Sequence, residues 1–301
     1  MHARKGNQKK MMTTTLISNP LLELSTRPGY EELREWALTL EKIGQKKAKF
    51  GGNLVLPNYY LSTMDGYDLE LVLTCLEKTL EKYSLFTFAS SLNHYCLSLD
   101  YSYPNESNFP AFQNLYRAVE DELGRFGVPF VGILMIDITD WVEKGACSEA
   151  KFLDFLRYMS DIDERTLAIY VDRSVSSKKS EKAQSTIITK TRIERLELKL
   201  KNAQIALEIL KNELNELGFA LAKEVEPKLL ETMDQILRVD GQEGPWTIRQ
   251  LAQDIVYNAF KTGDELNVIV DESILLPFLP GGTWLREFAA KKNYYMGLVG
   301  E

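Results

Sequence analysis

Two aspartates end the two most apolar stretches of this sequence. Val131-Gly-Ile-Leu-Met-Ile136 runs into Asp137, and Thr166-Leu-Ala-Ile-Tyr-Val171 runs into Asp172. Carboxylates that meet at one edge of a sheet supply the oxygen ligands that Mg²⁺ and Mn²⁺ prefer. Aspartates also cap helices, because a carboxylate accepts hydrogen bonds from main-chain N–H groups. No further acid or lysine has a diagnostic spacing, so we expect Asp137, Asp140 and Asp172 to be structural, with no metal or other cofactor.

Histidine and cysteine are too sparse for several common active sites. The chain has two histidines, His2 and His94, and its three cysteines, Cys75, Cys96 and Cys147, show no metal-ligand spacing. A Ser-His-Asp triad or a histidine-rich metal site is therefore not expected. The odd number of cysteines argues against a disulfide framework. We expect His94 to be a hydrogen-bonded residue in or beside a strand.

Helices and strands alternate around the two aspartates. Between the apolar runs, Phe152, Phe155, Leu156 and Met159 have the spacing of an amphipathic helix. Further strands are predicted at 53–56 and 85–89, and further helices at 30–46, 69–82 and 111–126. This alternation predicts an α/β fold with a parallel sheet sandwiched by helices, whose ligand crevice lies at the carboxyl ends of the strands.

Composition narrows the class of protein. Of the 301 residues 45% are hydrophobic and 26% are charged, which is typical of a globular protein. The net charge of −7 does not indicate nucleic acid as a partner, although a local basic face could still bind it. The longest apolar run is too short to span a bilayer and too far from the amino terminus to be a secretory signal. We therefore expect a cytoplasmic protein without membrane contact.

The order helix, Gly51-Gly52, apolar strand, loop and helix resembles the nucleotide-binding core of AAA-type P-loop ATPases. Ile133-Leu-Met-Ile-Asp137 is similar to a Walker B strand, and Thr166–Asp172 falls where that family has its sensor 1 strand. Gly244-Pro-Trp-Thr-Ile-Arg-Gln-Leu251 resembles the start of a lid-domain helix, and Arg249 would be its sensor 2 arginine. The resemblance covers residues 28–172 and 228–275.

The sequence departs from the family pattern at the residues that bind and hydrolyse the nucleotide. Met64-Asp-Gly-Tyr-Asp68 falls where the family has Gly-Lys-Thr. Gly66 matches the family's glycine. Tyr67 takes the place of the lysine that binds phosphate, and Asp68 takes the place of the threonine whose hydroxyl binds magnesium. Ile138 replaces the glutamate that would polarise the attacking water. Two like charges about 4 Å apart repel by about 4 kcal/mol at an effective dielectric constant near 20, so Asp68 would oppose a triphosphate. The resemblance thus implies a degenerate nucleotide site.

A leucine pattern with a period of seven residues follows the α/β segment. It indicates one long helix over residues 189–226, with alternating three- and four-residue spacing as in a coiled coil. We expect this seam to pair with a copy of itself or with a partner helix, and the chain's own α/β core is the competing surface. The seam consists of Ile193, Leu196, Leu200, Leu207, Leu210, Leu214, Leu217 and Leu221.

Four sections are predicted along the chain. They are a basic disordered tail at 1–28, a nucleotide-binding-like core at 29–186, the heptad helix at 187–227 and a small helical lid-like domain at 228–301. The resulting hypothesis is a non-hydrolysing, AAA-like assembly or regulatory subunit that works through protein contacts.

Two alternatives stay open. One is an active ATPase with a non-standard phosphate loop, in which Arg173 and Arg249 supply the positive charge. The other is a metal-dependent hydrolase of nucleic acid with Asp137 and Asp172 as ligands, helped by the basic tail.

Overall fold

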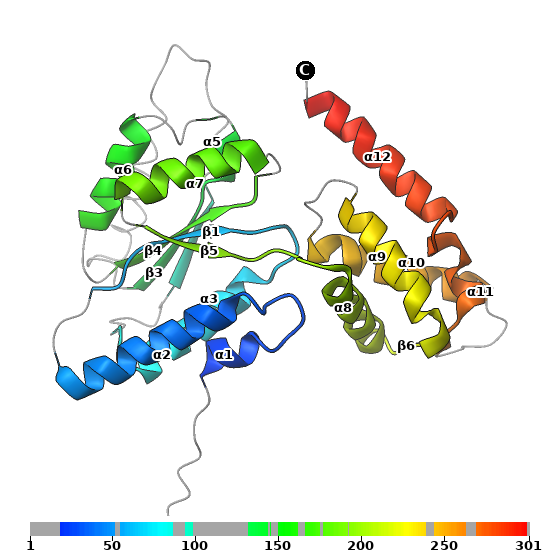
Figure 1. Cartoon of the computed structure of the whole chain (residues 1–301), viewed down its shortest axis with the longest axis horizontal. Coiled ribbons are helices and arrows are strands. Elements are labelled where there is room, and N and C mark those ends of the chain that lie inside the picture. Colours follow the sequence, from blue (N-terminus) through cyan, green and yellow to red (C-terminus); the bar gives the residue numbers. More distant parts are fainter. Residues whose placement is uncertain are drawn as a thin grey trace, which may run out of the picture.

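The chain folds into a sheet domain followed by a helical bundle (Figure 1). The structure is a computed structural model. It describes residues 19–51, 55–86, 94–98, 132–143, 145, 150–161, 166–174, 177–191, 193–238, 244–262 and 269–299. Within these ranges no helix has the length and apolar character that a membrane span requires.

Among the described residues, five parallel strands form the sheet, in the order β2-β3-β4-β1-β5. Their bounds are β1 Tyr59–Ser62, β2 His94–Ser98, β3 Gly132–Asp137, β4 Thr166–Asp172 and β5 Glu194–Glu197. The predicted parallel α/β fold is therefore confirmed. Ser62 pairs with Asp172, and Asp137 pairs with Val171, so the carboxyl ends of β1, β3 and β4 meet at one edge.

Helices cover both faces of the sheet (Figure 1). On one face lie α1 Pro20–Leu24, α2 Leu33–Phe50 and α3 Leu69–Lys82. On the other lie α5 Thr139–Glu143, α6 Ala150–Asp161 and α7 Ser177–Thr191. Successive strand side chains point to opposite faces, and Tyr59 and Leu61 pack with α1 to α3 in one apolar core. A sheet covered on both faces explains the nearly unbroken apolar strands.

The amino-terminal part differs from its prediction in two places. The first strand is Tyr59–Ser62 instead of 53–56. All four residues of this strand are buried, whereas Val55 of the earlier run is exposed. Residues 19–28 were assigned to the tail, but they contain α1, because Asn19 caps this helix and Leu21 and Leu24 are buried against the core.

Other predictions for the sheet domain are confirmed or lie outside the described residues. The helix at 69–82 and the strand at 166–172 have the predicted bounds. The helix predicted at 111–126 and the basic segment before residue 19 are not among the described residues. Of the strand predicted at 85–89, only Leu85 and Phe86 are described, and they are not in a strand.

The prediction of a single long helix over residues 189–226 is wrong. The segment contains the end of α7, then β5, the helix α8 Ala203–Glu216, and the short strand β6 Ala220–Leu221. Asn202 starts α8 by accepting a hydrogen bond from the main-chain N–H of Ile205. Gly218 follows its end with a φ of 85°, a conformation that glycine adopts readily. A helix start and a helix stop therefore interrupt the leucine repeat.

The chain itself covers most of the predicted seam. Leu207, Leu210 and Leu214 are buried in the helical bundle, whereas Leu217 is 45% exposed. Leu196 instead packs against the core of the sheet domain.

The bundle core therefore begins at Leu200, not at 228 as predicted. Besides α8 and β6 the bundle contains η2 Lys223–Val225, α9 Glu226–Arg238, α10 Pro245–Thr262, β7 Ile269–Val270, α11 Glu272–Leu275, η3 Leu276–Phe278 and α12 Thr283–Val299.

Substitutions in the seam should unfold the bundle. Leu210→Ala removes a fully buried side chain and should lower the free energy of unfolding by about 2–5 kcal/mol. Leu207→Glu combined with Leu214→Glu should melt the bundle, as measured by circular dichroism. Leu217→Glu is the control at an exposed position of the same repeat. A double variant that kept its helical signal and only changed its mass in light scattering would contradict this account.

Candidate functional site

Residues 63–68 form the loop that joins β1 to α3, where an α/β protein of this kind would hold an anion. Asp68 caps α3, and its Oδ1 accepts from the N–H of Leu71 at 2.9 Å. The main-chain N–H of Asp68 donates to the hydroxyl of Tyr30 at 3.0 Å. The start of α3 therefore carries its own carboxylate, and two of its N–H groups are already bonded.

Tyr67 points into the protein core. Its side chain is buried, and its ring meets the ring of Tyr30 edge-on with 5.4 Å between centroids. Burial, reinforced by the charge of Glu31, raises the pKa of Tyr67. It is therefore an uncharged phenol at the position where the family pattern has a lysine. A phosphate group would find no cation from this residue.

The amino-terminal end of α10 lies directly on the loop. A Cβ atom on Gly66, whose φ is 95°, would come within 2.1 Å of the main-chain nitrogen of Trp246. A Cβ atom on Gly244 would come within 2.1 Å of the carbonyl oxygen of Asp65. The N–H of Trp246 donates to that same oxygen at 3.4 Å. Two glycines thus allow two backbones to touch, and the bundle covers the loop.

Arg249 joins the same contact from one turn further along α10. Its guanidinium donates to the carbonyl oxygen of Gly66, and its Nε donates to Glu213 Oε1 at 2.7 Å. The position predicted for a sensor 2 arginine therefore does lie against the loop. Its charge is paired with a carboxylate of α8, and one of its N–H groups is bonded to the loop itself.

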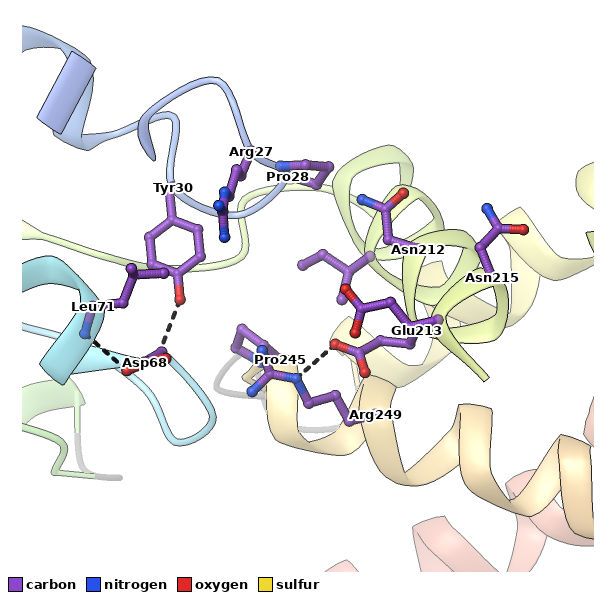
Figure 2. A pocket seen from close by; sticks show the side chains of 12 residues that line it. Arg27, Pro28, Tyr30, Asp68, Leu71, Asn212, Glu213, Asn215, Pro245 and Arg249 are labelled. Atoms are coloured by element: carbon purple, nitrogen blue, oxygen red, sulfur yellow. Dashed lines mark hydrogen bonds and ion pairs between the residues drawn. The ribbon is translucent and has the colours of Figure 1, made fainter. Parts of the chain in front are cut away.

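A cavity of about 530 Å³ remains beside this contact, between the sheet domain and the bundle (Figure 2). Three carboxylates, Asp68, Glu213 and Glu216, and two guanidiniums, Arg27 and Arg249, line it. The excess of negative charge opposes a triphosphate. The remaining lining residues are Pro28, Tyr30, Leu71, Ile209, Asn212, Asn215 and Pro245.

Sequence reasoning found Asp68 and Arg249 but missed Arg27, Tyr30 and Glu213, which also line this cavity. Arg27 and Tyr30 precede α2, and Glu213 lies on α8, which was assigned to the seam. The dipeptide Arg27-Pro28 just before a predicted helix was the available local signal. The contribution of α8 follows only from how the bundle packs on the sheet domain.

Asp172 is a buried carboxylate at the carboxyl end of β4. It is 1% exposed, and its Oδ2 accepts from the hydroxyl groups of Tyr60 and Ser180. Its Oδ1 accepts from the main-chain N–H of Ser174 at 2.8 Å. These bonds connect β4 to β1 and α7, and they use both carboxylate oxygens.

Asp137 likewise has local partners. Its Oδ1 accepts from the N–H and the hydroxyl of Thr139, at 3.0 and 2.6 Å, which starts α5. Its other oxygen forms an ion pair with Arg173. Arg173 is therefore neutralised, and Asp140 lies in the first turn of α5. Within the described ranges no group of three or more His, Cys, Asp or Glu side chains is arranged to hold a metal ion.

His94 lies in β2, as predicted, and both of its ring nitrogens contact carboxylates of α3. Nε2 is 2.6 Å from Glu70 and Nδ1 is 3.1 Å from Glu77. Burial alone would lower the pKa of His94, but the hydrogen bonds to Glu70 and Glu77 outweigh it and raise the pKa. The raised pKa favours the protonated ring, which pairs with both carboxylates and connects β2 to α3.

Comparison with known proteins defines the class of fold. No protein-family model and no curated protein matches the sequence. Among solved structures, a single-substitution variant of RuvB from Thermotoga maritima matches with a TM-score of 0.51 at 12% identity, over 86% of this chain and 70% of that one. The RuvB Holliday junction branch migration motor of the same organism gives a TM-score of 0.48 at 12% identity, over 82% and 66%. The chain therefore shares the overall fold of RuvB, a parallel α/β sheet flanked by helices as in P-loop NTPases.

Gly66→Ala should separate the loop from α10. Gly218→Ala is the matched control, because Gly218 also has a positive φ but no other atom lies within 4 Å of the place its Cβ would take. The control should cost about 1–3 kcal/mol of stability from backbone strain alone. Gly66→Ala should cost more in urea unfolding and should speed hydrogen exchange at the Trp246 amide. Equal losses in the two variants would refute the close contact.

The His94 contacts predict a pH dependence of stability. Because the pKa is raised in the folded state, the stabilisation is fully present below the unfolded value of about 6.5 and is lost as pH rises through the folded value. His94→Gln should therefore lower the urea midpoint more at pH 6 than at pH 9. His2→Gln is the control. A difference between wild type and His94→Gln that is independent of pH would exclude this role.

Proposed function

We propose that this chain is a non-hydrolysing AAA-type module that acts as an assembly or regulatory subunit through protein contacts. One observation carries the proposal: the loop after β1 contains no cationic residue of its own and is covered by residues 244–246. Residues 244–246 thus occupy the space over Gly66, beside the cavity of Figure 2. The contact between Gly66 and Trp246 replaces what a nucleotide would otherwise hold together.

The electrostatics of the loop support the same proposal. Binding of a triphosphate needs backbone N–H groups and positive charge around it. Here Asp68 occupies the helix start, and Tyr67 is buried and neutral. Ile138, at the position of the catalytic glutamate, is also fully buried and offers no base. These features argue against both nucleotide binding at the loop and activation of an attacking water.

The two alternatives have less support from the contacts of their key residues. An active ATPase would use Arg173 and Arg249, but each of these forms an ion pair, with Asp137 and Glu213 respectively. A metal-dependent hydrolase would use Asp137 and Asp172, whose oxygens accept hydrogen bonds from their own surroundings. Either function would first require these ion pairs or hydrogen bonds to break.

A role in protein contacts agrees with the surface of α10. Trp246, Tyr257 and Phe260 are 58%, 72% and 61% exposed. At 3.6 residues per turn these three positions lie within one quarter of the helix circumference. Aromatic side chains are enriched at protein interfaces.

Nucleotide should leave the stability of the protein unchanged. A ligand present at one hundred times its dissociation constant stabilises a protein by about 2.7 kcal/mol, which a melting curve resolves. We expect millimolar ATP with Mg²⁺ to change neither the melting temperature nor the free phosphate concentration. A clear rise in melting temperature that disappears in Arg249→Ala, but persists in the exposed control Arg238→Ala, would support the active ATPase instead.

A further inference from the structure

A basic surface lies at the carboxyl end of α2, at the end of the sheet domain that is remote from the bundle (Figure 1). The segment 42–50 contains four lysines and no acidic residue, in a chain whose net charge is −7. Three of these lysines and Phe50 are exposed to solvent. The surface shares no residue with the cavity of Figure 2, so it is a separate part of the molecule.

The three exposed lysines, Lys42, Lys46 and Lys49, form a row along the outer side of α2. At 3.6 residues per turn they lie within about 60° of one another around the helix and span about 10 Å along it. None of them forms a salt bridge within the described part of the chain. The helix dipole favours lysines only in the last turn, to which Lys42 and Lys46 do not belong. The lysine row therefore has a positive charge that the fold does not use.

The end of α3 adds positive charge beside the lysine row. A Cβ atom on Gly44 would come within 2.5 Å of Tyr83 Cβ, so this glycine lets α2 lie directly on the residue that follows α3. Lys47 Nζ donates to the carbonyl oxygen of Ser84 at 2.6 Å. Lys82 Nζ lies 5.1 Å from the centroid of the Tyr83 ring. Lysines of two helices are thus gathered on one surface.

Positive charge is in excess at this surface. Residues 41–50 and 81–84 together contain five lysines and two carboxylates, Glu41 and Glu81. Glu41 already accepts a hydrogen bond from Gln45. A local excess of cations on an acidic chain attracts a polyanion, and nucleic acid supplies a regular row of phosphates whose counterions are released when lysines replace them.

Phe50 favours a single strand over a duplex. Its side chain is 75% exposed, and Lys49 Nζ lies 5.2 Å from the centroid of its ring. Around α2 the ring lies between Lys46 and Lys47. Proteins that bind single strands combine cations that track the backbone with aromatic rings on which unpaired bases stack. Phe50 and the lysine row have this arrangement.

We propose that this surface binds single-stranded nucleic acid, with phosphates on the lysine row and a base stacked on Phe50. The proposal does not depend on the function proposed for the loop after β1. That loop precedes α3, whereas the basic surface lies where α3 ends.

Fluorescence anisotropy of a labelled oligothymidylate, titrated with the full chain, tests the proposal. We expect a dissociation constant of about 10⁻⁶–10⁻⁴ M at physiological salt, and an association constant that falls with a log–log slope of about −0.7 for each phosphate contacted. Lys42→Gln/Lys46→Gln/Lys49→Gln should weaken binding at least tenfold and make the slope shallower by about 2. The control Lys178→Gln/Lys182→Gln/Lys261→Gln removes the same charge from exposed positions of α7 and α10 and should leave the slope unchanged.

Phe50→Leu tests the stacking separately from the charge. Leucine keeps an apolar side chain but offers no ring, so binding should weaken at least about fivefold while the salt slope stays the same. A strand of the same length without bases should bind the wild type as weakly as the thymidylate binds Phe50→Leu.

Two results would overturn the proposal at once. One is no change in anisotropy at about 10⁻⁴ M protein, and the other is an equal salt slope in the lysine-row variant and its control. Vesicles that contain phosphatidylserine test a membrane instead. If Phe50→Leu bound these vesicles as well as the wild type and also kept full affinity for the thymidylate, the surface would be a membrane contact and base stacking would be refuted.

Discussion

The contact of Gly66 with Trp246 and of Gly244 with Asp65 joins the two halves of the molecule at the point where chemistry would be expected. Two backbones approach within the space of a missing Cβ atom on each side. Arg249 then reaches Gly66 and Glu213 together, which connects the loop to both α10 and α8. The cavity lined by Arg27 and Asp68 is what remains open beside this contact. Larger residues at either glycine would force the sheet domain and the bundle apart.

Asp68, Asp137 and Asp172 each have partners within the sheet domain. Asp68 caps α3, Asp137 starts α5 and pairs with Arg173, and Asp172 receives the hydroxyl groups of Tyr60 and Ser180. A buried carboxylate must be hydrogen-bonded or paired, because its desolvation is otherwise too costly. These partners account for the aspartates as parts of the fold. They also explain why acids at the carboxyl ends of parallel strands need not form a catalytic centre.

Local signals in the sequence predicted much of the sheet domain. Thr166–Asp172 and Leu69–Lys82 were predicted with their bounds, because an unbroken apolar run and a capped amphipathic pattern report strand and helix directly. The seven-residue leucine repeat misled, since periodicity reports which side chains are buried and not whether one helix carries them all. Asn202 and Gly218 contained the information that interrupts it.

The candidate site was only partly predictable for a different reason. Arg27, Tyr30 and Glu213 reach one cavity from segments that are remote in the sequence, and their meeting depends on how the bundle packs against the sheet. Asp68 and Arg249 were predicted because the family resemblance fixes their order along the chain. What the resemblance could not supply is that residues 244–246 fill the space above the loop.

The most direct test of the central claim is the hydrogen-exchange rate of the Trp246 amide, measured by NMR with and without ATP and Mg²⁺. This amide donates to Asp65 across the contact between the two halves. Our account predicts slow exchange in the nucleotide-free protein and no change when nucleotide is added. Fast exchange that becomes slow only with ATP would mean that the nucleotide, and not the chain, closes the site.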